Sequence, residues 1–163
     1  MKRLLLYAAL ISLTVSMGSS TPPQVEVVKF PRLQALMTKS SDQIQVINFW
    51  ATWCKPCIKE LPYFQAIHQK WGSQVDVTLI SLDFADEVQK KVIPFVQKKD
   101  LKPKVLVLDE LDYNSWIDRV DARWTGSIPA TLIIDPKTGK RQFVEGEVTQ
   151  AQIESMVQKF IKN

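Results

Sequence analysis

A Cys-Lys-Pro-Cys sequence contains the only two cysteines of this 163-residue chain. Cys54 and Cys57 lie between an apolar run typical of a buried strand, residues 44–50, and a run whose apolar residues recur at helical spacing. On the first turn of a helix, sulfurs at positions i and i+3 share one face and can close a small disulfide ring. Unpaired backbone amides at the helix N-terminus would stabilise a thiolate at Cys54. A redox dithiol is therefore the leading hypothesis, with Cys54 as nucleophile and Cys57 as resolving thiol.

The residues around the cysteines favour redox chemistry over two other roles. Lys55 adds a positive charge, and Pro56 suits an early helical position, where its missing N–H costs little. A zinc site would need two further ligands, and His68 is the only histidine. A passive disulfide around so short a loop would restrict the unfolded chain only modestly. We therefore predict redox chemistry with no bound metal and no dissociable cofactor.

The first residues differ in character from the rest of the chain. Two basic residues precede an apolar stretch, residues 4–15, and small residues follow it, which is typical of a secretory signal peptide. The stretch is shorter than the roughly 20 residues of a membrane-spanning helix, so an uncleaved anchor is the alternative. We predict a signal peptide over residues 1–18, a linker over 19–24 and one domain over 25–163. Export would place this domain in the periplasm or another extracytoplasmic space, either free or tethered to the membrane.

The charge balance gives no indication of a nucleic-acid partner. The chain has a formal net charge of +4, and without Lys2 and Arg3 it has 19 basic side chains against 17 acidic ones. A nearly balanced surface does not favour binding to a polyanion. With 45% hydrophobic residues, the chain is long enough for one domain with a real core. We expect a monomer.

Alternating strand-like and helix-like segments predict an α/β fold. Strands are expected at residues 25–28, 44–50, 75–82, 105–108 and 131–134, with 141–144 as a hairpin partner. Helices are expected at residues 31–37, 54–71, 86–99, 112–120 and from 149 onward, where a Thr-x-x-Gln capping box occurs. Pro94 should kink the helix over residues 86–99. This order implies a mixed sheet covered on both faces. It places the cysteines beyond the C-terminal end of a central strand, where α/β folds usually locate chemistry.

Two segments resemble the thioredoxin superfamily: FWATWCKPC at residues 49–57, and SIPAT at residues 127–131. More narrowly, CIKELP at residues 57–62 and the export signal are similar to the TlpA/ResA branch of exported thiol–disulfide oxidoreductases. The resemblance implies a thioredoxin-like fold with a central mixed sheet flanked by helices. It also implies an extra strand and helix, inserted between the CxxC helix and the cis-proline loop.

The resemblance implies roles for several residues near the cysteines. Ile128-Pro129 is the expected cis peptide bond beside the two sulfurs. The backbone of Ile128 is expected to pair with an extended substrate segment, which is a form of strand addition. Trp53, Lys55 and Pro56 are expected to face the substrate as well.

A departure from thioredoxins proper concerns the proton acceptor for Cys57. Asn48 stands six positions before the first cysteine, where thioredoxins usually carry a buried aspartate, and an amide cannot exchange protons near neutral pH. Proteins of the TlpA/ResA branch tend to share this asparagine and to use a glutamate three residues after the second cysteine, which here is Glu60. On a helix, Glu60 would be close enough to Cys57 to act directly or through one water. The alternative role of Glu60 is that of a solvated helix residue.

The expected function is an exported thiol–disulfide oxidoreductase that reduces disulfides of exported proteins. The resemblance suggests apocytochrome c among the substrates and a membrane thiol reductase as electron donor. A dithiol oxidase of folding proteins is one alternative, and a thioredoxin-fold module that only binds a peptide or haem partner is another. A peroxiredoxin is disfavoured because the sequence has no Thr-x-x-Cys segment. Trp116 and Trp124 could line a substrate surface or pack in the core.

Overall fold

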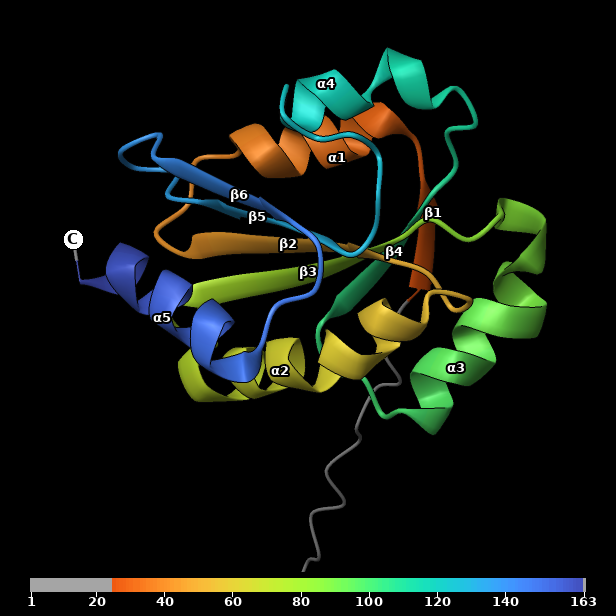
Figure 1. The fold of residues 1–163 in the computed structure, drawn as a ribbon, viewed down its shortest axis with the longest axis horizontal. Coiled ribbons are helices and arrows are strands. Elements are labelled where there is room, and N and C mark those ends of the chain that lie inside the picture. The colour runs from red at the N-terminus through yellow and green to blue at the C-terminus, as the bar shows by residue number, and fades with distance from the viewer. Residues whose placement is uncertain (1–24, 163) are drawn as a thin grey trace, which may run out of the picture.

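The computed structural model describes residues 25–162, and the signal peptide and linker predicted over residues 1–24 lie outside them. A six-stranded sheet with the strand order β1-β4-β3-β2-β5-β6 runs through the centre of the fold (Figure 1). The strands are β1 (Val25–Val28), β2 (Ile44–Trp50), β3 (Val75–Ser81), β4 (Lys104–Leu108), β5 (Ala130–Ile134) and β6 (Arg141–Glu145). The first four strands pair in parallel, whereas β5 is antiparallel to both β2 and β6. The predicted mixed sheet is confirmed.

Strand β2 is the central strand that delivers the chain into the Cys pair. It pairs with β3 on one side and with β5 on the other, so that Phe49 lies opposite both Ile80 and Ala130. Every residue of β2 is buried. An unbroken apolar run is what a strand covered on both faces requires. The predicted position of the cysteines, beyond the carboxyl end of a central strand, is therefore correct.

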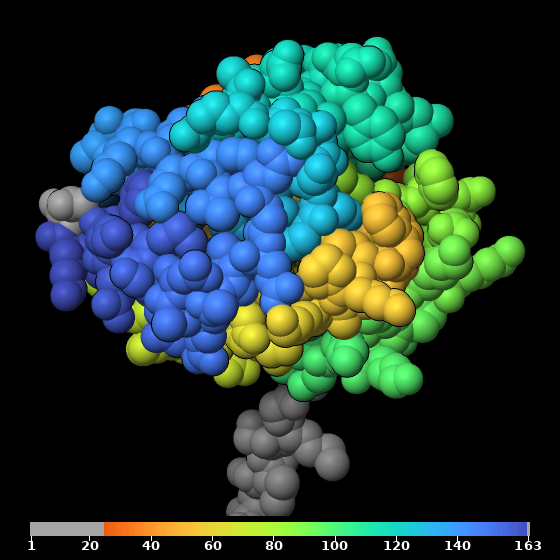
Figure 2. Space-filling model, in the orientation of Figure 1, coloured from red at the N-terminus to blue at the C-terminus, as the bar shows by residue number. Residues whose placement is uncertain are grey.

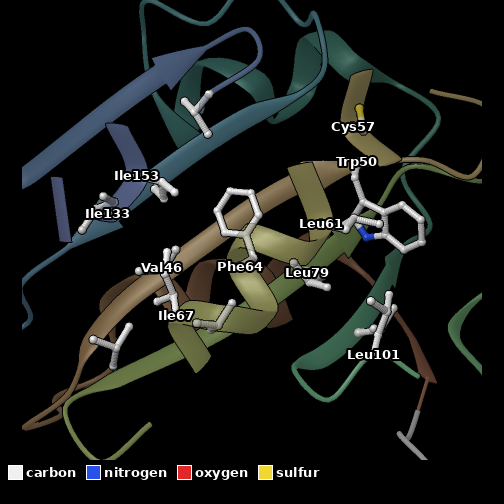
Figure 3. Packing of buried hydrophobic residues seen from close by; sticks show 14 of the residues in the cluster. Val46, Trp50, Cys57, Leu61, Phe64, Ile67, Leu79, Leu101, Ile133 and Ile153 are labelled. Atoms are coloured by element: carbon white, nitrogen blue, oxygen red, sulfur yellow. The ribbon is translucent and has the colours of Figure 1, made fainter. Parts of the chain in front are cut away.

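Helices cover both faces of the sheet (Figure 1). One face carries α1 (Phe30–Thr38) and α4 (Ile117–Val120), and the other carries α2 (Lys55–Trp71), α3 (Ile93–Lys98) and α5 (Gln150–Ile161). Each face has a core of its own, with Leu33 and Trp116 in the first and Phe64 and Val157 in the second. Figure 3 shows the second core, which follows α2 up to the buried Cys57. The CxxC helix is thus anchored to the sheet along its length.

The last helix begins and packs as its sequence predicts. Thr149 is the N-cap residue of α5: its hydroxyl accepts from the Gln152 N–H at 3.3 Å, and the Gln152 side chain accepts from the Thr149 N–H at 2.8 Å. These reciprocal bonds form a capping box. The buried face is the predicted one, formed by Ile153, Met156, Val157 and Phe160.

The helix predicted over residues 86–99, with a kink at Pro94, is divided into three parts in the structure. The segment forms a 3₁₀ turn, η1 (Ala85–Glu87), then a π-helical turn, η2 (Val88–Val92), and then α3. Pro94 has no N–H to donate to the carbonyl of Lys90, and its ring crowds that carbonyl. The Ile93 N–H instead bonds the Val88 carbonyl five residues back, which is the pattern of a π turn. The predicted apolar face is nevertheless buried, at Val88, Val92 and Val96.

The helix predicted over residues 112–120 is also interrupted. A 3₁₀ turn, η3 (Tyr113–Ser115), and α4 are separated by Trp116, whose φ of −138° is not helical. The indole of Trp116 is 1% exposed and packs near Phe30 and Phe49, with ring centroids 6.3 and 6.4 Å away. Tertiary packing of this side chain therefore decides the local backbone. The view that part of the segment between α2 and β5 is an insertion stays a prediction.

Candidate active site

The Cys54–Cys57 pair lies at the start of α2, just beyond β2. The two cysteines form a disulfide, with their Cα atoms 5.3 Å apart. Cys54 is the N-cap residue of α2, and its sulfur accepts the Cys57 N–H at 3.3 Å. Cys54 is 6% exposed and Cys57 is fully buried. Cys54 is therefore the more accessible sulfur, which fits its predicted role as nucleophile.

Asp83, two residues after the end of β3, fixes the loop that leads into the Cys pair. The Thr52 N–H donates to Asp83 Oδ2 at 2.9 Å, and the Thr52 hydroxyl donates to Oδ1 at 2.5 Å. The Ser81 hydroxyl donates to Oδ2 at 2.7 Å. Asp83 is 1% exposed, so three donors satisfy a carboxylate that is withdrawn from water. This network sets the position of the backbone immediately before Cys54.

The loop before β5 lies beside the disulfide. The Ile128-Pro129 peptide bond is cis, as the resemblance implies. The carbonyl oxygen of Ile128 is 3.8 Å from Cys54 Sγ. The Gly146 N–H donates to the Pro129 carbonyl at 2.8 Å, which ties this loop to the end of β6. The structure thus brings the predicted binding loop next to the predicted nucleophile.

Glu145, the last residue of β6, holds the same loop through its carboxylate. It accepts the N–H groups of Thr125 and Ser127 at 3.1 and 3.0 Å, and it also accepts the Thr125 hydroxyl. These bonds hold the pKa of Glu145 below its ordinary value, and the bond from the Thr125 hydroxyl has the largest effect. The side chain therefore stays ionised at neutral pH and acts as a fixed anion.

Glu60 lies one helical turn after Cys57 and is fully buried. The side-chain amide of Asn48, on β2, donates to Glu60 Oε1 at 2.8 Å. The Val148 N–H, just before α5, donates to Oε2 at 2.9 Å. The alternative that Glu60 is a solvated helix residue is therefore wrong. Its carboxyl group instead joins α2 to the central strand and to the segment between β6 and α5.

Burial raises the pKa of Glu60 to about 7, against the lowering effect of the hydrogen bonds from Val148 and Asn48. Removing a carboxylate from water penalises its charged form, and two donors offset only part of that penalty here. A carboxyl group with such a pKa can accept and release a proton at neutral pH. Among the described carboxylates near the disulfide, Glu60 thus has the property that a proton-handling residue needs.

The other predicted site residues differ in their exposure to solvent. Trp53 is 62% exposed, and Lys55 and Pro56 are exposed as well. Ile128 is half-buried and Pro129 is buried. Trp53, Lys55 and Pro56 are thus accessible to a partner, and the role of all five residues in substrate binding stays a prediction.

Trp116 and Trp124 pack in the core and do not line a substrate surface. They are 1% and 3% exposed, and their rings are 5.5 Å apart between centroids. Trp124 also packs against Phe49 at 4.5 Å, and its indole N–H donates to the Ser127 carbonyl at 2.8 Å. Trp124 therefore links the loop before β5 to the core.

Sequence reasoning missed Asp83 and Glu145. Asp83 lies two residues after β3, the parallel neighbour of β2, and the carboxyl ends of adjacent parallel strands meet at one edge of a sheet. Its position was therefore a usable signal. Glu145 offered no such signal, because its partners Thr125 and Ser127 lie 20 and 18 residues away in an irregular loop.

Within residues 25–162, no group of three or more histidine, cysteine, aspartate and glutamate side chains is placed to hold a metal ion. Across the same residues, no helix has both the length and the apolar character that a membrane crossing requires.

Comparison with known proteins agrees with this geometry. The sequence matches the AhpC/TSA family over residues 31–140, which include both cysteines and the cis-proline loop. The chain belongs to the AhpC/TSA family. The thiol-disulfide oxidoreductase ResA of Bacillus cereus (strain ZK / E33L) is 36% identical over 113 residues, which cover 69% of this chain and 61% of that protein. Thioredoxin-like protein YneN of Bacillus subtilis (strain 168) is 29% identical over 112 residues, covering 67% and 60%.

A solved structure shows the same fold. The thioredoxin-related protein from Neisseria meningitidis serogroup B matches with a TM-score of 0.63 at 24% identity, covering 76% of this chain and 88% of that one. The thioredoxin-like fold implied by the sequence is thereby confirmed. This family member spans about 61% of the length of the first curated relative that it matches.

Proposed function

We propose that this protein is a thiol–disulfide oxidoreductase whose Cys54–Cys57 pair reduces disulfides of exported proteins. The observation that carries the proposal is a disulfide at the N-terminus of α2 with the buried, titratable Glu60 one turn behind it. Relatives named thiol-disulfide oxidoreductase ResA support the same chemistry. The exposed Trp53 and the neighbouring Ile128 loop supply a surface for a protein substrate.

The reaction starts from the reduced dithiol. Cys54 attacks as a thiolate, which the start of α2 stabilises because the Cys57 N–H points at its sulfur. A bond forms between Cys54 Sγ and one substrate sulfur, and the substrate disulfide breaks. The other substrate sulfur leaves as a thiolate. The product is a mixed disulfide through Cys54.

Cys57 then resolves the mixed disulfide. Its thiol gives a proton to Glu60, directly or through one water, and the resulting thiolate attacks Cys54 Sγ. The second substrate sulfur leaves, and the protein returns to the Cys54–Cys57 disulfide. Two electrons have passed to the substrate. A separate thiol donor must reduce the pair again, and we assign this step to a membrane thiol reductase.

Substrate binding uses the exposed residues around Cys54. The backbone of Ile128 pairs with an extended segment of the substrate, while Trp53, Lys55 and Pro56 contact its side chains. The substrates are exported proteins with oxidised cysteine pairs, apocytochrome c among them. Export depends on the signal peptide predicted over residues 1–18, and the domain works as a monomer that is either free or tethered to the membrane.

The reduction potential of the Cys54–Cys57 pair tests the direction of this reaction. Equilibration with a glutathione or dithiothreitol series should give a value near that of thioredoxin, about −270 mV, if the pair is a reductant. A value near about −120 mV would make it an oxidant of folding proteins. A pair that never titrates reversibly would contradict the redox proposal and favour a module that only binds its partner.

A trapping experiment tests the assignment of the two cysteines. In the Cys57→Ser variant, Cys54 can still attack but is not released, so mixed disulfides with substrate proteins should accumulate. The matched Cys54→Ser variant should form none. Equal trapping by both variants would show that Cys54 is not the nucleophile.

A further inference from the structure

Exposed apolar side chains gather beside the loop that carries the Cys pair. Phe84, Leu111 and Tyr113 are 56%, 71% and 43% exposed and line a common hollow with Asp83. Asp83 is hydrogen-bonded to Thr52, so this hollow begins next to the loop before Cys54. This first hollow is only about 10 Å³, and a wider one of about 510 Å³ continues from it between residues 84–87 and residues 109–111. We call the two together the apolar hollow.

Three segments that are distant in sequence meet at this place. Figure 2 shows the segment around the cysteines, in orange-yellow, beside the yellow-green segment that follows β3, with the teal segment that follows β4 above both. The loop before β5 borders the cysteines on another side, with the Ile128 carbonyl 3.8 Å from Cys54 Sγ. A substrate segment that runs from the Ile128 loop past Cys54 can therefore continue toward the apolar hollow.

The rim of the apolar hollow is acidic. Its lining includes Asp86, Glu87, Asp109 and Glu110. Lys91 pairs with Glu87, and Lys29 pairs with Asp109 at 2.9 Å. Two of the four carboxylates thus pair with a lysine, which leaves a net negative charge at the rim. This local excess of negative charge stands on a chain whose formal net charge is +4, so it complements a basic partner.

We propose that the apolar hollow binds the substrate of the thiol–disulfide exchange at a position a few residues from its reacting cysteine. The segment that fits carries one large apolar side chain flanked by lysine or arginine. An exposed apolar patch rimmed by polar groups is typical of an interaction site, and an apolar anchor in a pocket supplies binding energy. The acidic rim selects among exported proteins by charge and speeds their approach. This inference rests on the proposed function and specifies its substrate class.

Two synthetic peptides test the inference with the full chain. Each contains one cysteine in a mixed disulfide with thionitrobenzoate and a phenylalanine three residues away, flanked by two lysines in one peptide and two glutamates in the other. The reduced protein should release thionitrobenzoate from the lysine peptide about tenfold faster at low salt, and added salt should reduce this ratio. All rates are divided by the rate with hydroxyethyl disulfide, which has no side chain to dock.

Matched variants locate the effect. Asp86→Lys should bring the lysine-to-glutamate ratio below about threefold, whereas Asp118→Lys, an exposed change on α4, should keep it. Leu111→Ser should slow the lysine peptide several-fold, whereas Val27→Ser, on the edge strand β1, should not. Unchanged rates and ratio in the Asp86 and Leu111 variants would overturn the docking site.

The two proposals fail in different ways. Equal rates with both peptides, together with normal reduction of hydroxyethyl disulfide, would overturn the docking site and leave the proposed function standing. Failure to reduce any of the three disulfides would overturn both.

Discussion

Two glutamates hold two sides of the candidate active site, and their pKa values shift in opposite directions. Glu60, behind the cysteines on α2, is fully buried, and burial raises its pKa to about 7. Glu145, beside the binding loop, is partly exposed, and its hydrogen bonds with Thr125 and Ser127 lower its pKa. The same side chain is therefore a titrating acid in one place and a permanent anion in the other.

Desolvation explains the difference. Glu60 accepts two hydrogen bonds, but its carboxyl group is withdrawn from water. The free-energy cost of burying its charge is larger than the stabilisation that two neutral donors provide. Glu145 accepts three hydrogen bonds at a site that water still reaches, so the bonds decide its pKa. Glu60 is thus suited to proton transfer, and Glu145 is suited to positioning the Ile128 loop.

The largest expected effect follows when Glu60 can no longer titrate. Glu60→Gln should slow the resolution of a mixed disulfide by Cys57 about a hundredfold at neutral pH, because a positioned base contributes roughly 10²–10⁴-fold. Stopped-flow release of the second thiol, followed across neutral pH, measures this step. The wild-type rate should rise through an inflection near 7 that the variant lacks. Glu145→Gln is the matched control and should keep the inflection. An unaltered profile in Glu60→Gln would remove Glu60 from the mechanism.

The same substitution should change how stability depends on pH. The folded-state pKa of Glu60, about 7, lies above its ordinary value of 4.5, so the unfolded state loses the proton first as pH rises. The free energy of unfolding should therefore fall between these two pH values, by about 3 kcal/mol. Urea unfolding of the oxidised protein at several pH values measures the fall. Glu60→Gln should flatten the curve over this window, and a variant that retains the full fall would point to another group.

Local patterns in the sequence were enough to predict most of the fold. The unbroken apolar run of β2 and the capping box at Thr149 each specify their element without help from distant residues. A kink at Pro94 was predicted, but the 3₁₀ and π turns before it and the break at Trp116 were not. The backbone before Pro94 adapts to the missing N–H of the proline. The backbone at Trp116 adapts to an indole that is buried in the core.

The site could be predicted only in part from local sequence. The spacing of Cys54 and Cys57 was enough to predict the redox pair. Ile128 and Glu60 were predicted only through the resemblance to a known family. Asp83 and Glu145 act through partners 31 and 20 residues away, Thr52 and Thr125. The contact of Asp83 could have been inferred from the order of the strands, whereas no sequence signal indicates the contact of Glu145.

A smaller effect is expected at the permanent anion. Glu145→Gln should weaken the hydrogen bonds to Thr125 and Ser127 and cost about 1 kcal/mol of stability at neutral pH. Because the wild-type pKa is lowered, this stabilisation is present above the ordinary value of 4.5 and is lost as pH falls through the folded-state pKa. The variant and the wild type should therefore converge in acid. Urea unfolding at neutral and acidic pH measures both, and a difference that grows in acid would contradict the assignment.

The smallest expected effect concerns Asn48, the side chain that donates to Glu60. Asn48→Ala removes a hydrogen bond that favours the ionised carboxylate, so the pKa of Glu60 should rise above about 7, by less than about one unit. The pH inflection of the resolution rate should move upward accordingly. Thr131→Val is the matched control, because Thr131 only accepts from the same amide at 3.2 Å, and it should leave the inflection in place.

The direction of that shift also tests how the Asn48 amide is oriented. An amide nitrogen that faces Glu60 stabilises the carboxylate, whereas an amide oxygen in the same place would accept from the protonated acid and stabilise the neutral form. An inflection that moves downward in Asn48→Ala would therefore mean that the oxygen faces Glu60. Asn48 would then hold the proton on Glu60, burial and hydrogen bonding would act in the same direction, and the contrast with Glu145 would be larger than burial alone produces.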